Sequence, residues 1–173
     1  MANRAAPLLR AAGYEWDDED YLLDVIDVLL ERVETLADFV DQSCYFFRRD
    51  VEYDEEARKR LAAGQSYLED MERQLSMVEF WDYDSLDDLI RNYVQAQGVG
   101  LGKVMMPLRV AISGSTSTPS VVDVMSILDK QVVLERIGKA INVINAGLPD
   151  DNPQKEAEAA AAVAEPPQPG SGS

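Results

Sequence analysis

The sequence contains no histidine and only one cysteine, Cys44, among its 173 residues. The absence of imidazole excludes Ser-His-Asp and Cys-His hydrolysis, and it excludes zinc or iron sites that depend on histidine ligands. A single cysteine cannot form an internal disulfide, which is typical of a protein from a reducing compartment. Because Cys44 shares a helical stripe with Phe39, Val40 and Phe47, we expect it to be a small buried apolar residue.

Long apolar segments are also missing. The amino-terminal residues MANRAAPLLRAAGY hold no run long enough for a signal peptide, and no later stretch reaches the ~18 apolar residues of a membrane span. The sequence therefore predicts a cytoplasmic protein with no membrane partner. The 46% of apolar residues is sufficient for one packed domain or two small ones.

Basic residues are scarce, and their distribution is uneven. The chain has 32 acidic and 16 basic residues, a net charge of −16 that argues against nucleic-acid binding over the whole surface. Residues 1–90 hold 24 acids and nine bases, whereas residues 91–145 hold three acids and six bases. The segment 91–145 is either a docking face for an anion or a stretch that simply lacks acids.

Apolar residues recur with helical spacing along almost the whole chain, and no strand-like alternation is sustained. The sequence therefore predicts an all-α protein. The expected helices cover residues 19–34, 36–48, 55–64, 67–78, 86–94, 101–111, 121–128 and 133–144.

Capping signals mark several of these helices. The acidic run 17–20 is interpreted as a cap and solvated turn, because calcium loops need a central glycine that is missing here. Residues 85–88 have the form of a capping box, and Thr118 followed by Pro119 has the form of an N-cap and first helical residue. Pro107 is expected to kink or interrupt its helix. Residues 148–173, rich in Ala, Glu, Pro, Gly and Ser, are predicted to be a flexible tail or linker.

Catalytic chemistry has no evident place in the sequence. The carboxylates lie on the polar faces of amphipathic helices, and the glycines at 98, 100 and 102 lack the preceding strand of a phosphate-binding loop. We therefore expect no catalytic residue, no metal site and no cofactor.

One segment carries a specific resemblance. Residues 101–114, LGKVMMPLRVAISG, are followed by STSTP, and together they resemble the C-terminal anticodon-binding region of bacterial glutamyl-tRNA synthetases, with its pattern G-K-x-x-x-P-L-R-x-A-x-T-G and a short loop ending in S/T-P. Similar matches are LERVETL at 30–36, YFF at 45–47, VEYD at 51–54, Trp81 and LERI at 134–137. Order and spacing agree across residues 4–147, and Ser113 departs mildly from the usual threonine.

The resemblance implies two small helical subdomains forming an α-helical cage or bundle, at residues 1–95 and 96–147, the second with the recognition segment. The catalytic half of these synthetases has an H-I-G-H-like ATP signature, which a chain without histidine cannot contain, and no K-M-S-K-S-like loop is present. The expected function is therefore anticodon-loop binding to glutamate tRNA, in support of glutamyl-tRNA aminoacylation by a catalytic domain in cis or in trans. An acidic protein-interaction module that lost RNA binding is the alternative.

The same resemblance assigns candidate RNA-binding residues. Arg32, Arg91 and Arg109 match the family's anticodon-contacting arginines, Thr118 and Val121 match residues around its recognition loop, and Lys103 is a candidate phosphate contact.

Structural roles stay open for these residues. Arg32 is alternatively an ion-pair partner of nearby glutamates, Arg91 a partner of Asp87 or Asp88, Arg109 a support for the kink, and Thr118 a helix cap. The aromatic residues Phe46, Phe47, Trp81 and Tyr83 are expected in the core rather than in stacking contacts with bases.

Overall fold

The computed structural model describes residues 2–147, and within that range it contains only α-helices and no strand. The predicted all-α class is therefore confirmed for this part of the chain. The predicted tail at 148–173 lies outside the described residues. The helices are α1 Ala2–Ala11, α2 Glu19–Leu29, α3 Leu36–Phe47, α4 Glu55–Ala63, α5 Gln65–Ser76, α6 Tyr83–Gln97, α7 Leu101–Ser113, α8 Val121–Ile127 and α9 Lys130–Asn145.

Most predicted helices are present, but the amino-terminal half differs in two places. Helix α1 was not predicted, and it buries Ala5 and Leu9 against the core. Helix α2 ends at Leu29 rather than near residue 34. The cause is a capping box in which Thr35 and Asp38 satisfy each other's backbone amides, so that α3 starts anew at Leu36.

Three predicted local signals need correction. The predicted capping box at 85–88 is wrong, because α6 begins earlier and Asp82 is its N-cap, accepting from the Ser85 amide at 2.8 Å. Thr118 is not an N-cap either, since α8 begins at Val121 after Ser120. Pro107 lies inside α7, which runs from Leu101 to Ser113, so the predicted interruption is absent, while the predicted kink stays a prediction. By contrast, Asp18 caps α2 as the acidic run predicted.

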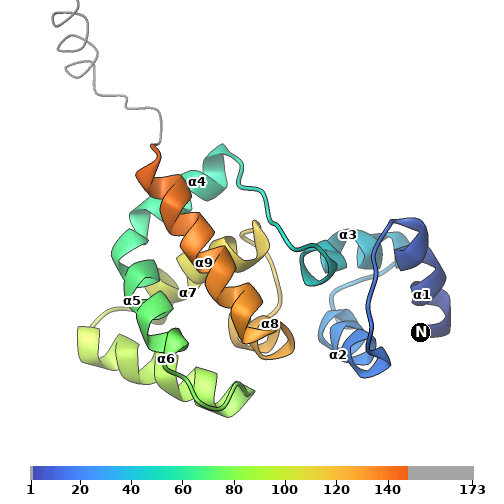
Figure 1. Cartoon of the computed structure of the whole chain (residues 1–173), viewed down its shortest axis with the longest axis horizontal. Helices are drawn as coiled ribbons and strands as arrows, with labels where there is room; N and C mark the ends of the chain where they lie inside the picture. Colours follow the sequence, from blue (N-terminus) through green and yellow to red (C-terminus); the bar gives the residue numbers. More distant parts are fainter. Residues whose placement is uncertain (1, 148–173) are drawn as a thin grey trace, which may run out of the picture.

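The helices form two lobes joined by residues 48–54 (Figure 1). Helices α1, α2 and α3 pack together in one lobe, and in the other α5 packs on α9, α4 on α7 and α6 on α8. The lobes meet where α2 contacts α8. Helices α4, α5 and α6 thus share a lobe with α7, α8 and α9, whereas the expected boundary at residue 95 separates them. Where independently folding units begin and end stays a prediction.

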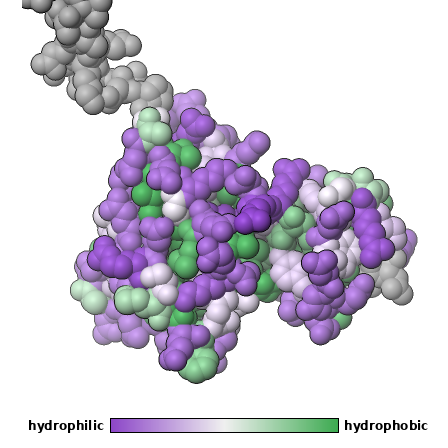
Figure 2. Space-filling model, viewed as in Figure 1, coloured by the Kyte–Doolittle hydropathy of each residue, from purple (hydrophilic) through white to green (hydrophobic). Residues whose placement is uncertain are grey.

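The apolar core runs through both lobes and leaves a mainly polar outer face (Figure 2). Phe46 is buried, while Phe47, Trp81 and Cys44 are half-buried and pack against the core. Tyr83 is the exception among the aromatic residues predicted in the core, because 43% of it is exposed. No helix in the described range is long and apolar enough to cross a membrane.

Candidate nucleic-acid interface

Arg136 of α9 holds the two lobes together at their junction. Its guanidinium is 2% exposed and donates to the carbonyl oxygens of Tyr45 and Arg48 at 2.6 Å and of Ile112 at 2.7 Å. These acceptors lie at the carboxyl-terminal ends of α3 and α7, where helix carbonyls lack intrahelical partners and the helix dipole favours a cation. Burial lowers the pKa of Arg136.

Other bases of the segment 91–145 also have structural partners. Lys130 donates to the carbonyls of Ser76 and Val78 at the end of α5. Lys139 binds Asp50 and the Val51 carbonyl in the connection between the lobes. Three of the six bases in this segment, Lys130, Arg136 and Lys139, therefore bind helix ends or join elements, which the charge count alone did not distinguish from an anion-binding face.

Arg91 lies on the exposed surface of α6 and pairs with Asp87 one turn earlier, at 2.6 Å. This is one of the structural roles that the sequence left open for Arg91. The hydrogen bond to Asp87 and the charge of that carboxylate raise the pKa of Arg91.

Arg32 follows the end of α2 and lines a groove of about 610 Å³ between α2 and α8. Within residues 2–147 it forms no salt bridge with a glutamate or any other acid within 4.0 Å. Pro119 of the 115–120 loop lines the same groove, so the structure brings Arg32 beside this loop. The groove also has four carboxylates, contributed by Asp24, Asp27, Glu31 and Asp123.

Arg109 occupies the third turn of α7, half-buried, on the other lobe. No described acid lies within salt-bridge distance of it, and its Nε is buried without a hydrogen-bond partner. Burial raises the pKa of Tyr45, and the charges of Arg32 and Arg109 oppose that effect. Arg32 follows α2 and Arg109 lies in α7, and both of these helices pack on α8.

The loop after α7 is held by hydroxyl groups. Ser113 donates to the Arg109 carbonyl at 2.7 Å and accepts from the Ser115 amide at 3.1 Å, so serine fills the role that the threonine of the family pattern offers. Thr118 is 7% exposed and donates to the Pro119 carbonyl, and Val121 is 1% exposed. Both side chains thus support the loop from inside.

Lys103 lies elsewhere, in a cavity of about 420 Å³ beside α4 and α5 that Arg60 and Tyr67 also line. Among the candidate residues, the structure therefore groups Arg32, Arg109, Thr118 and Val121 at the junction and places Lys103 apart.

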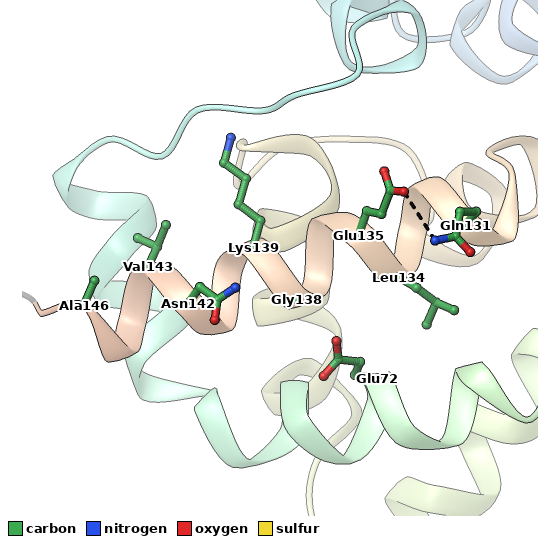
Figure 3. Close-up of a pocket in the computed structure, with 9 residues that line it drawn as sticks. All are labelled: Glu72, Gln131, Leu134, Glu135, Gly138, Lys139, Asn142, Val143 and Ala146. Carbon is green, nitrogen blue, oxygen red and sulfur yellow. Dashed lines mark hydrogen bonds between the residues drawn. The ribbon is translucent and has the colours of Figure 1, made fainter.

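A separate groove of about 670 Å³ follows α9 along its contact with α5 (Figure 3). Gly138 forms its floor opposite Glu72, and Gln131 donates to Glu135 at 3.3 Å. Within the described residues, no three cysteine, aspartate or glutamate side chains are placed so that they could hold a metal ion.

Comparison with known proteins agrees with the geometry. The family "Anticodon binding domain" matches residues 1–141. Glutamate–tRNA ligase of Thermus thermophilus is 33% identical over 141 residues, which are 82% of this chain and 30% of the ligase. The ligase of Anaeromyxobacter sp. strain Fw109-5 is 33% identical over 146 residues, 83% of this chain and 31% of that protein.

Solved structures give the same result. The glutamate tRNA ligase of Elizabethkingia meningosepticum superimposes with a TM-score of 0.71 at 25% identity, over 82% of this chain and 29% of that one. Glutamate-tRNA synthetase of Elizabethkingia anophelis gives 0.69 at 28% identity, over 82% and 28%. The chain thus spans about 30% of the length of the curated relatives it matches. It belongs to the anticodon-binding domain family of glutamate–tRNA ligases.

Proposed function

We propose that the chain binds the anticodon loop of glutamate tRNA at the junction between its two lobes. The observation that supports this most directly is that Arg32 and Arg109 come from opposite lobes, from elements that both pack on α8, and that neither is paired with a carboxylate among the described residues. Unpaired guanidinium groups are what base recognition needs, because one arginine can stack on a base and donate to an acceptor edge.

The loop 115–120 supplies the second part of the proposed site. Its backbone is fixed by the serine hydroxyls and by the buried Thr118 and Val121, so its exposed groups can meet bases splayed out from a single strand. Lys103 and Arg91 lie outside this junction and are proposed to contact phosphates of the same RNA arm.

The four carboxylates of the α2–α8 groove constrain how RNA lies on the protein. Phosphates are repelled by such a surface, whereas bases, which are neutral, are not. We therefore place the bases of the loop toward Arg32 and Arg109 and the phosphates toward solvent. The proposed role is to support glutamyl-tRNA aminoacylation by a catalytic synthetase domain in cis or in trans, without glutamate activation by this chain.

Fluorescence anisotropy tests the proposal with an RNA hairpin that reproduces the anticodon arm of a glutamate tRNA, and with a second hairpin of altered anticodon. Arg109→Ala and Arg32→Ala are each expected to weaken binding of the first hairpin by about 1 to 3 kcal/mol and to reduce discrimination between the two. Arg73→Ala is the matched control, because it removes the same charge from an exposed pair with Asp70 on α5. Equal weak binding of both hairpins by all four proteins would refute the proposal.

The alternative, an acidic helical module that binds a protein partner, has the net charge of −16 and the four groove carboxylates in its favour. It predicts no measurable affinity for either hairpin at low salt. It also predicts capture of a basic protein that Asp27→Asn together with Asp123→Asn weakens.

A further inference from the structure

Three buried polar atoms at the junction lack a hydrogen-bond partner within residues 2–147: the Tyr45 hydroxyl, Arg109 Nε and Arg136 Nε. Arg136 is held by three other hydrogen bonds through its terminal nitrogens, whereas the hydroxyl is the only polar atom of the Tyr45 side chain. Tyr45 is only 5% exposed. Buried polar atoms in native proteins are almost always paired, and an unpaired one lowers stability. The Tyr45 hydroxyl and Arg109 Nε lie at the proposed binding surface, where a bound state can satisfy both.

The backbone brings together the ends of the two helices that carry these side chains. Arg136 donates to the carbonyl of Tyr45 on α3 and to that of Ile112 on α7, which brings the ends of the two helices together. Arg109 lies three residues before Ile112, one turn back along α7. The charge of Arg109 also lowers the pKa of Tyr45 against the larger effect of burial. At neutral pH the phenol stays protonated and can both donate and accept.

We propose that Tyr45 is a positioning residue for Arg109, and that its phenol oxygen accepts a hydrogen bond from Arg109 Nε–H when the terminal nitrogens of Arg109 bind an anticodon base. This inference rests on the proposed function. RNA cannot reach the two buried atoms directly, so they are satisfied by each other, through a rotation of the arginine side chain. The hydrogen bond then exists only in the bound state and contributes to affinity rather than to folding.

Tyr45→Phe in the full chain tests the inference, because it removes one atom and leaves the ring in place. Its affinity for the glutamate anticodon hairpin, measured by fluorescence anisotropy, is expected to fall about tenfold, as for loss of one hydrogen bond to a charged group. Its urea midpoint is expected to stay unchanged or to rise. Tyr53→Phe is the matched control: the Tyr53 hydroxyl donates to the Ala111 carbonyl at 2.6 Å, so its loss lowers the urea midpoint without weakening RNA binding by the folded protein.

A double-mutant cycle separates positioning from a general structural effect. Arg109→Lys keeps the charge but removes Nε, so Tyr45→Phe added to Arg109→Lys is expected to cause no further loss of affinity. Additive losses, unchanged affinity of Tyr45→Phe, or a fall in its urea midpoint equal to that of Tyr53→Phe would overturn the inference. Failure of the unmodified chain to bind the hairpin would overturn the proposed function and this inference together, whereas binding that Tyr45→Phe leaves intact would overturn only the latter.

Discussion

Replacement of Arg136 by methionine is the strongest stability perturbation that the structure predicts outside the apolar core. Methionine keeps an unbranched side chain of similar length but has no donor for the carbonyls of Tyr45, Arg48 and Ile112. All three acceptors lie at helix ends, so no other backbone amide replaces the lost donors. The two lobes would also lose the buried link that joins α3 to α7.

The magnitude follows from the three contacts. A hydrogen bond from a charged donor contributes about 1.5–3 kcal/mol, and a buried acceptor left unpaired costs about 1–3 kcal/mol. The guanidinium pays a desolvation cost that methionine does not pay, as the lowered pKa of Arg136 indicates, so the contributions do not simply add. We expect the free energy of unfolding to fall by about 3–5 kcal/mol, because three buried carbonyls lose their donor while the desolvation cost of the guanidinium is removed.

Urea unfolding followed by circular dichroism at 222 nm measures the loss. Because Arg136 joins the lobes, we also expect Arg136→Met to separate the unfolding of α1–α3 from that of α4–α9, which broadens the transition and lowers its apparent m-value. Arg136→Lys keeps the charge but not the planar guanidinium, so its free energy of unfolding is expected to lie between those of the unmodified chain and Arg136→Met.

Arg49→Ala is the matched control, because Arg49 also crosses between the lobes, in an exposed ion pair with Glu135 at 3.8 Å. Its cost is expected to be at most about 1 kcal/mol. A single transition for Arg136→Met, with a midpoint equal to that of Arg49→Ala, would refute the reasoning.

Two further perturbations test packing and ionisation. A Cβ at Gly64 would overlap the Pro107 ring where α4 packs on α7, so Gly64→Ala is expected to cost about 1–3 kcal/mol in urea unfolding, whereas Gly102→Ala, with open space around it, should not destabilise the protein. Burial raises the pKa of Tyr21 to about 12, and burial together with the hydrogen bond to Asp70 raises that of Tyr93 to about 12, so the unfolded state loses those protons first. Stability should therefore hold up to about pH 10 and then fall until about pH 12, by up to about 1.4 kcal/mol per pH unit for Tyr21. Urea midpoints that stay constant between pH 10 and 12 would contradict the raised pKa values of Tyr21 and Tyr93. A Gly64→Ala protein as stable as the unmodified chain would contradict the close packing of Gly64 on Pro107.

The helices of this protein were largely predictable because their apolar residues repeat with a local period. The residues that cap these helices were less predictable. Asp18 caps α2 as the acidic run indicates, and Asp54 caps α4, but Ser85 and Thr118, which also have good local signals, are not N-caps. The N-cap is an earlier residue, Asp82, in α6 and a later residue, Ser120, in α8.

The candidate site was likewise only partly predictable from the sequence. Motifs in register indicated Arg32 and Arg109, but nothing local distinguished them from Arg136, which belongs to an equally well-matched motif and is buried in a structural role. The sequence indicates nothing about Tyr45 beyond its place in the YFF segment. The signal that marks it, a buried hydroxyl without a partner, exists only after α3 and α7 are brought together.

The sequence by itself determined the all-α class and the absence of histidine chemistry, since both depend on composition and on the spacing of residues along one chain. The motifs that carry the family resemblance also lie within residues 1–141, which the family matches. Only the tertiary structure decided which basic residues are available to a ligand. A charge count treats Lys130, Arg136 and Lys139 like Arg109, whereas the fold gives the first three carbonyl partners at helix ends and between lobes. That assignment depends on distances between residues far apart in the chain, which no local pattern contains.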